Sequence, residues 1–250
     1  MSKNQMQATS FFEKTVNFFI GRGSDEKRLD VEDRQVPYLE IGVADQPKQP
    51  LLIGVHGFGA NETQMKTLVN IELDQPVTYI APRGSYAHPT GGYAWFPIEV
   101  QDGHILLDPK RLEVCIDELD AFIEAAVERY DADPQRVVFV GYSQGGALAF
   151  AYLLRHPERI VASVATAGSL LLDALPWADE SKMAEKHLFI GYGTLDPFVT
   201  RDEMETAATF FNSLGVNTTL KSYRIPHVVS QTEVSDIEAF LKGILKSTTH

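Results

Sequence analysis

Short apolar runs alternate along this chain with longer segments in which apolar residues recur every three or four positions. The short runs predict buried β-strands, and the longer segments predict amphipathic helices. Strands that alternate with helices of this length build a mostly parallel sheet with helices on both faces, so we predict a single-domain α/β fold. Strands are predicted at residues 51–55, 77–80, 137–140, 160–164, 188–190 and 218–221, and helices after Asn61 and at 108–130, 144–155, 201–214 and 233–245.

Two segments interrupt this alternation. Residues 1–35 are polar and charged except for an aromatic cluster at residues 11–20. We expect them to form an N-terminal extension, docked or flexible, ahead of a main domain at 36–250. The cluster would dock as a helical turn or as an added edge strand. Residues 82–107 are rich in glycine, proline and aromatic residues, and a loop of this length is usually functional.

Charge narrows the classes of partner. The 34 acidic and 22 basic residues give a net charge of −12 at pH 7. Such a surface repels phosphate backbones and anionic lipid headgroups, so we expect no nucleic-acid partner and no stable membrane association. No run approaches the roughly 20 apolar residues of a membrane span, and polar residues interrupt the N-terminal aromatic cluster too often for a secretory signal.

The only cysteine, Cys115, lies on the apolar face of the helix predicted at 108–130. We expect it to pack in the core rather than to react. A lone cysteine forms no internal disulfide, which favours a reducing compartment.

One motif carries chemistry. Residues 141–146 read Gly-Tyr-Ser-Gln-Gly-Gly and stand directly between a predicted strand and a predicted helix. In this context the pattern G-x-S-x-G forms a nucleophile elbow. A sharp strand-to-helix turn holds the serine in a strained backbone conformation and projects its hydroxyl at the carboxyl end of the sheet. We therefore predict that Ser143 is a nucleophile.

A serine nucleophile needs a base, and the base needs an acid that orients it. In enzymes whose G-x-S-x-G serine stands on a strand-to-helix elbow, these follow the serine in the order carboxylate, histidine. Asp196 and His227 each follow a predicted strand, so both lie at the edge of the sheet where the serine is expected. Asp202 is the second candidate for the orienting acid. The alternatives are a turn or helix-capping role for Asp196 and a backbone-bonded loop role for His227.

An oxyanion hole needs two backbone N–H donors. We expect one from Gln144, which follows the nucleophile, and one from Phe58, in the His-Gly-Phe-Gly loop after the strand at 51–55. His56, which opens that loop, is expected to bond to the backbone there. His88 and His104 lie in the 82–107 loop and are candidates for substrate contact, whereas His156, His187 and His250 fit no catalytic role.

Several segments resemble a known family when they are taken in order. They are His-Gly-Phe-Gly-Ala from residue 56, Ala-Pro-Arg-Gly from 81, Trp95-Phe96, Gly-Tyr-Ser-Gln-Gly-Gly from 141, Gly-Thr-Leu-Asp-Pro-Phe-Val from 193, and His227. This series resembles the phospholipase/carboxylesterase family of α/β-hydrolases, which includes bacterial carboxylesterases and acyl-protein thioesterases. The resemblance covers about residues 37–245.

The resemblance implies an α/β-hydrolase fold for the main domain and hydrolysis of acyl esters without a metal or cofactor. It also implies a cytoplasmic enzyme. Pro97 stands where the family often has an acidic residue, and Val228-Val229 stand where it has a small or acidic one. These two departures leave the alcohol-side and acyl-side preferences open. The N-terminal 35 residues have no counterpart that we can place.

We therefore predict a serine carboxylesterase that acts on small, short- to medium-chain acyl esters through an acyl-enzyme intermediate. Two alternatives stay open. One is an acyl thioesterase or lysophospholipase that uses the same site. The other is a binding protein with a hydrolase fold, against which the complete set of serine, aspartate and histidine argues. A homodimer is compatible with the sequence.

The pocket is the least determined part of the site. Aromatic candidates for its lining are Phe58, Trp95, Phe96 and Phe198, and the alternative for each is a place in the core. The apolar segment 168–177 follows a predicted strand end. Its Trp177 belongs either to a flap over the acyl chain or to a short helix packed on the sheet.

Overall fold

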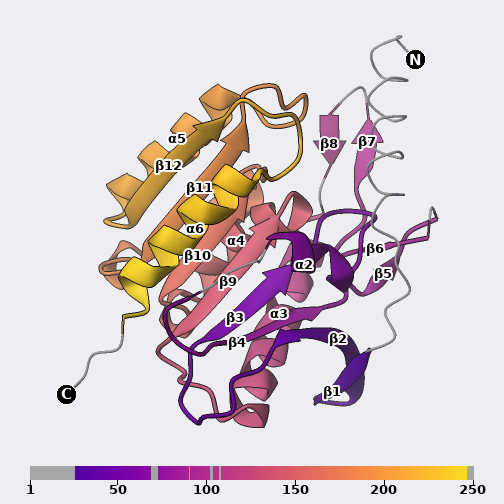
Figure 1. Ribbon diagram of the computed structural model, residues 1–250. Coiled ribbons are helices and arrows are strands. Elements are labelled where there is room, and N and C mark those ends of the chain that lie inside the picture. Colours follow the sequence, from indigo (N-terminus) through magenta and orange to yellow (C-terminus); the bar gives the residue numbers. More distant parts are fainter. Residues whose placement is uncertain (1–25, 69–72, 90, 102–103, 107, 247–250) are drawn as a thin grey trace.

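The computed structural model describes residues 26–68, 73–89, 91–101, 104–106 and 108–246, and a single twisted sheet runs through it (Figure 1). The order of its eight strands is β1-β2-β4-β3-β9-β10-β11-β12. Six of them, from β4 to β12 in that order, run parallel, and β2 runs antiparallel to both of its neighbours, β1 and β4. The strands are β1 (Lys27–Val31), β2 (Arg34–Gly42), β3 (Leu51–Val55), β4 (Thr78–Pro82), β9 (Val137–Tyr142), β10 (Ala162–Thr166), β11 (His187–Gly193) and β12 (Asn217–Tyr223).

Helices cover both faces of this sheet (Figure 1). Helices α3, α4 and α5 share one apolar cluster with the sheet, and α2 and α6 share the other. The predicted α/β fold is therefore confirmed. The helices are η1 (Glu62–Gln64), α2 (Met65–Leu68), α3 (Pro109–Arg129), α4 (Gln144–Arg155), η2 (Pro157–Arg159), η3 (Leu172–Trp177), η4 (Glu180–Lys182), α5 (Arg201–Ser213) and α6 (Gln231–Ile244).

The central strands divide their side chains between the two clusters. Along β3, Leu51 and Ile53 pack toward α3 and α4, whereas Leu52 packs toward α2 and α6. Successive side chains of a strand point to opposite faces, and here both faces are covered. This is why the central strands read as continuous apolar runs in the sequence rather than as an alternation of apolar and polar residues.

Several strands extend further at their carboxyl ends than the sequence predicted. β9 continues to Tyr142 and β12 to Tyr223, and β10 is displaced by two residues to Ala162–Thr166. Ile160 belongs to the predicted apolar run but only closes the turn η2. The strand ends were missed because glycine, threonine and tyrosine replace aliphatic residues there. These ends hold the site described below.

The segment 82–107 is not a plain loop. It contains two small hairpins, β5–β6 (Tyr86–Ala87 and Tyr93–Ala94) and β7–β8 (Glu99–Gln101 and His104–Leu106). Strands of two or three residues are too short to show a period of two, so the hydrophobic pattern does not reveal them.

The sheet reaches into the segment that we assigned to the N-terminal extension. β1 pairs with β2 from Lys27 to Val31, so this hairpin forms an edge of the sheet. Leu29 and Val31 are buried in the larger apolar cluster. The aromatic cluster at residues 11–20 lies outside the described residues. The division of the chain at residue 35 therefore stays a prediction, although residues 27–31 already belong to the sheet.

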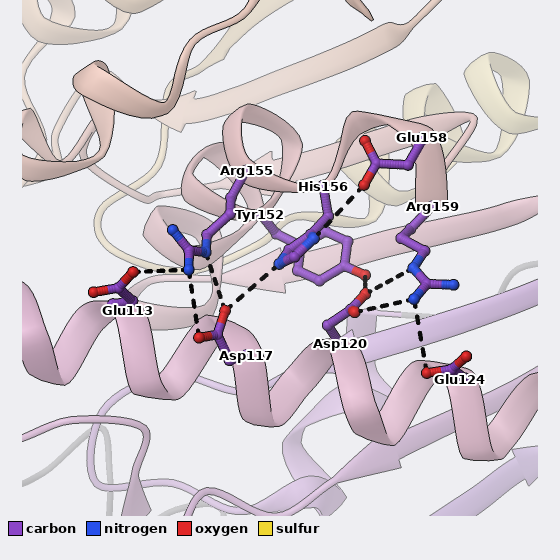
Figure 2. Close-up of polar contacts among 9 residues, drawn as sticks. All are labelled: Glu113, Asp117, Asp120, Glu124, Tyr152, Arg155, His156, Glu158 and Arg159. Atoms are coloured by element: carbon purple, nitrogen blue, oxygen red, sulfur yellow. Dashed lines mark hydrogen bonds and ion pairs between the residues drawn. The ribbon is translucent and has the colours of Figure 1, made fainter.

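Polar contacts join α3 to the carboxyl end of α4 (Figure 2). The Arg155 guanidinium bonds to Asp117, with Nε 3.0 Å from Oδ1, and the buried Tyr152 hydroxyl donates to Asp120 over 2.7 Å. Exposed ion pairs contribute little each, so the Tyr152 bond is the firmer part of this junction. Glu113, Glu124, His156, Glu158 and Arg159 complete the cluster.

Cys115 is buried on α3, as predicted. Burial raises the pKa of its thiol far above the ordinary range, so the nucleophilic thiolate is suppressed. None of the helices in the described ranges is long and apolar enough to cross a membrane.

Candidate active site

Ser143 occupies a tight turn between β9 and α4. Its backbone has φ 56° and ψ −113°, a strained conformation for a residue with a side chain, and its N–H donates to Thr166 O over 2.9 Å. The tight turn is possible because its glycines, which have no side chain, leave room for the neighbouring backbone. A Cβ on Gly145 would lie 1.9 Å from Val55 O, at the end of β3. The elbow predicted from the sequence is therefore present, and the backbone around it is tightly packed.

The structure brings the three predicted residues into one chain of hydrogen bonds. His227 Nε2 lies 2.9 Å from Ser143 Oγ, and His227 Nδ1 lies 2.7 Å from Asp196 Oδ2. Each residue follows the carboxyl end of its own strand, β9, β11 or β12. Because these strands are parallel, the three ends meet at one edge of the sheet.

Asp196 is held by more than the histidine. Its Oδ1 accepts the backbone N–H groups of Phe198, at 2.8 Å, and Val199, at 3.2 Å, and its side chain is fully buried. Three donors therefore surround the carboxylate and fix its orientation toward His227. The Tyr142 hydroxyl donates to His227 O over 2.7 Å and fixes the loop that carries the histidine. The second candidate for the orienting acid, Asp202, lies exposed in the first turn of α5.

The loop after β3 runs directly beside the elbow. Gly57 to Ala60 form a β-turn, in which Ala60 N donates to Gly57 O over 3.2 Å. Its third residue, Gly59, has φ 72°, as a type II turn requires. A Cβ on Gly57 would lie 3.2 Å from Ser143 Cβ. The structure thus brings the Gly57–Phe58 peptide next to the serine, together with Gln144, whose N–H opens α4 without a partner inside the helix.

His56 bonds to the backbone, as predicted. Its Nδ1 is 2.8 Å from Gly57 O, and its Nε2 accepts the Gly84 N–H at 3.0 Å. The second contact requires Nε2 to be unprotonated, so the proton lies on Nδ1 and donates to Gly57 O. Complete burial lowers the pKa of His56 to about 4, which keeps the ring neutral at neutral pH.

The Gln144 side chain ties the elbow to the segment after β6. Its Oε1 accepts Trp95 N and its Nε2 donates to Phe96 O, both at 2.9 Å. The Trp95 indole in turn donates to His56 O over 2.9 Å. Trp95 and Phe96 are both buried in the larger core cluster, so they brace the site from within the core.

Two other predicted pocket residues lie beside the site and are half-buried. The Phe198 ring contacts the His227 ring at 5.1 Å between centroids, and Phe58 contacts His88 at 4.7 Å. Trp177 is elsewhere. Its ring packs under the guanidinium of Arg155, the last residue of α4, whose backbone lies about 18 Å along the helix from Ser143.

Segment 168–177 therefore follows the plainer of its two interpretations. Leu170, Leu171 and Trp177 pack against the core, and residues from Leu172 on form the short helix η3. Leu172 itself is exposed. In this arrangement Trp177 does not form a flap over Ser143.

Comparison with known proteins settles the family. A family model described as Phospholipase/Carboxylesterase matches residues 36–245. The chain belongs to this family. It is a hydrolase of the α/β type, as the sequence motifs implied. Within the described residues, no group of three or more histidine, cysteine, aspartate or glutamate side chains is arranged to hold a metal ion.

Two curated relatives match this chain over nearly their whole length. Acyl-protein thioesterase 1 of Debaryomyces hansenii is 25% identical over 227 residues, which cover 84% of this chain and 98% of the relative. The putative hydrolase MhqD of Bacillus subtilis is 26% identical over 203 residues, 81% of this chain and 96% of that protein.

Solved structures agree on the fold. The Bacillus cereus carboxylesterase superposes with a TM-score of 0.73 at 22% identity and covers 85% of this chain and 96% of its own. Esterase PE8 superposes with a TM-score of 0.72 at 25% identity and covers 84% and 98% of the two chains. Both likenesses place this family member on the α/β-hydrolase fold.

A buried acid outside the triad was not found by sequence reasoning. Glu233, in the first turn of α6, is almost completely buried, and a Cβ on Gly191 of β11 would meet its Oε1 at 2.1 Å. Burial is the largest cause that raises the pKa of Glu233, a backbone hydrogen bond from Ser230 lowers it, and the nearby Asp236 charge raises it; together they bring the pKa to about 8. The signal in the sequence was a serine followed three residues later by glutamate, a capping pair at the helix start.

Glu233→Gln is expected to stabilise the protein at pH 8 and not at pH 5. Since the folded pKa exceeds the ordinary value of 4.5, folded protein keeps a proton that unfolded protein releases between these values. Wild-type stability should then fall by up to about 1.4 kcal/mol per pH unit as the pH rises from about 5 to 8. Gln keeps the capping bond without titrating.

Urea unfolding of both proteins at pH 5, 6.5 and 8 measures this difference. Glu238→Gln, at a less buried position of the same helix, is the control and should follow the wild type. Wild-type and Glu233→Gln curves that stay parallel across this range would show that Glu233 does not titrate there.

Proposed function

We propose that this chain is a serine carboxylesterase that hydrolyses short- to medium-chain acyl esters through an acyl-enzyme intermediate. One observation carries the proposal. A continuous chain of two hydrogen bonds links the hydroxyl of Ser143, whose backbone is strained, to His227, and His227 to the buried Asp196. A nucleophile, a base and an orienting acid in this geometry suit acyl transfer.

In the proposed first step, Ser143 Oγ attacks the ester carbonyl carbon while His227 Nε2 takes the hydroxyl proton. Asp196 holds the proton on Nδ1 and stabilises the imidazolium that forms. The carbonyl oxygen becomes an oxyanion, which the N–H groups of Phe58 and Gln144 bind. His227 then gives its proton to the leaving alkoxide, and the alcohol departs.

In the second step, water replaces the alcohol. His227 removes a proton from a water molecule that attacks the acyl-serine carbonyl. A second oxyanion forms in the same hole and collapses, and the proton returns to Ser143 Oγ. The free acid leaves. The same groups serve both steps, so one arrangement of donors and base is sufficient.

The surroundings of the triad favour acyl chains of limited length. Leu195 and Val228, the neighbours of Asp196 and His227 in sequence, expose apolar side chains, and Phe58 and Phe198 are half-buried. These residues supply apolar contact at the edge of the sheet. Trp177, the candidate for covering a long chain, lies at the other end of α4.

We expect kcat/KM on p-nitrophenyl esters to rise from acetate to butyrate and then to level off or fall. Each methylene buried on binding contributes about 0.8 kcal/mol, or roughly a fourfold gain. A series from acetate to palmitate, assayed with purified protein, measures this. A continuous rise to palmitate would contradict the short-chain preference, and no hydrolysis of any ester by folded protein would contradict the proposed activity.

Thioester hydrolysis is the second candidate, because several relatives carry the name acyl-protein thioesterase. A matched pair of ester and thioester with the same acyl group separates the two, since the acyl site is then constant. Lysophospholipase activity belongs to the same comparison. A cytoplasmic location and a homodimer stay predictions.

A further inference from the structure

We propose that Gln64 is a positioning residue for the oxyanion hole: its side chain holds the Gly57 N–H and thereby fixes the direction of the Phe58 N–H beside Ser143. This assignment rests on the proposed function, because it gives Phe58 the role of an oxyanion donor. Gln64 itself is not a catalytic residue. It would act only through the backbone that it holds.

The loop needs such support because its residue nearest to the nucleophile is a glycine. A Cβ on Gly57 would lie 3.2 Å from Ser143 Cβ and 3.2 Å from the Tyr142 ring. These contacts are tight, so a side chain is disfavoured there. Glycine, however, has the largest conformational freedom of any residue. Its orientation must therefore come from hydrogen bonds to other parts of the chain.

Both polar groups of Gly57 are engaged. Gln64 Oε1 accepts the Gly57 N–H at 2.8 Å. On the other side, Gly57 O accepts from His56 Nδ1 at 2.8 Å and from Ala60 N at 3.2 Å. These bonds hold Gly57 from two directions and restrict rotation about both of its backbone angles.

The consequence passes to Phe58 through the geometry of the peptide bond. The Gly57 carbonyl and the Phe58 N–H belong to one planar, trans peptide and point in opposite directions. A Gly57 that is fixed at both ends therefore also fixes the direction of the Phe58 N–H. An oxyanion hole depends on donors that are aimed before the reaction, because misaimed donors must reorganise as charge develops.

Gln64 is itself held firmly. It closes the short helix η1, whose cap Asn61 accepts Thr63 N at 2.9 Å, and its side chain is buried. Glu62 of the same turn accepts two hydrogen bonds from Arg83, one of them from Nε at 2.8 Å. Burial opposes ionisation of Glu62, but the Arg83 bonds outweigh it and lower the Glu62 pKa. This ion pair fastens η1 to Arg83, the residue that follows β4, so Gln64 reaches Gly57 from a rigid support.

The test compares Gln64→Met with Thr67→Val. Methionine has a similar length and volume but no strong acceptor, so the variant loses the bond to Gly57. Thr67→Val removes another 2.8 Å side-chain bond of the same helical segment, from Thr67 Oγ1 to Gln64 O, without touching Gly57. For both variants and the wild type, kcat and KM on p-nitrophenyl butyrate, Tm, and inhibition by a trifluoromethyl ketone with a butyryl-like chain are measured. This ketone adds to the serine and places an oxyanion in the hole.

We expect Gln64→Met to lose about 10- to 100-fold in kcat, less than the loss on deleting an oxyanion donor. KM should stay within about twofold, and the inhibition constant of the ketone should rise by the same factor as kcat falls. Thr67→Val should keep wild-type kinetics. Equal kcat losses in the two variants, or a Gln64→Met enzyme within twofold of wild type, would overturn the assignment.

A second variant separates the loss of this hydrogen bond from an effect of misfolding. Gln64→Asn keeps a polar amide but is one methylene too short to reach Gly57, so the same kinetic loss is expected at near-native Tm. Failure of the proposed function looks different. Wild-type protein that neither hydrolyses esters nor reacts with a fluorophosphonate would overturn that function and the role of Gln64 together, whereas active wild type with active Gln64 variants would overturn only the latter.

Discussion

Ser143→Ala is expected to lower kcat by at least about 10³-fold and to leave a folded protein with a small residual activity. The alanine lacks the Oγ that lies 2.9 Å from His227 Nε2, so no acyl-enzyme forms. The backbone donors remain and still polarise a bound carbonyl, which accounts for the residual activity. Initial rates on p-nitrophenyl butyrate, with circular dichroism as a check on folding, measure the loss.

Covalent labelling supplies the control for this substitution. A fluorophosphonate should add one phosphonyl group to the wild type and none to Ser143→Ala, as read from intact mass. Cys115 offers no competing nucleophile, because its thiol is buried and its pKa is raised. A wild type that stays unlabelled, or a Ser143→Ala enzyme with normal activity, would refute the role of Ser143.

Asp196→Asn is expected to lower kcat by up to about 10⁴-fold while the fold is kept. The structure explains why the damage is severe. Oδ1 accepts two backbone N–H groups, from Phe198 and Val199, so the amide oxygen of asparagine must take that position. The amide NH2 then faces His227 Nδ1, which must become an acceptor. The proton moves to Nε2, and the ring no longer takes the Ser143 proton.

Asp202→Asn is the matched control. Asp202 is the nearest alternative acid in the sequence, but it lies exposed in the first turn of α5, where a negative charge complements the helix N-terminus. Its substitution should leave kcat within about twofold of the wild type. A damaging Asp202→Asn and a mild Asp196→Asn would reverse the assignment of the orienting acid.

The sequence pattern predicted the six parallel strands, the long helices and the position of the three site residues for one physical reason, but it did not predict β1 and β2. Parallel strands buried on both faces are continuous apolar runs, and the residue after each run lies at one common edge. Ser143, Asp196 and His227 could be assigned to that edge before any contact between them was known. The roles of the Gln64 and Gln144 side chains could not be predicted in this way. Their hydrogen bonds join irregular segments, and no periodicity records such bonds.

Trp177 shows the limit of the same rule. Segment 168–177 follows the end of β10, which places its start near the serine, but the chain then runs along α4 toward Arg155. A strand end fixes where a loop begins and not where it goes. The short hairpins at 86–94 and 99–106 were missed for a related reason, because so few residues form them.

The parallel order of the strands also bears on how the enzyme gains and loses its activity. His227 bonds to Asp196 across 31 residues of chain and to Ser143 across 84. Contacts between such distant positions form slowly, because long loops must close first. Among the strands of the described residues, β12, which His227 follows, is the outermost on its side of the sheet. Transient opening of that edge therefore separates base from nucleophile while the centre of the sheet stays folded, so the local stability of one edge strand limits the lifetime of the working site.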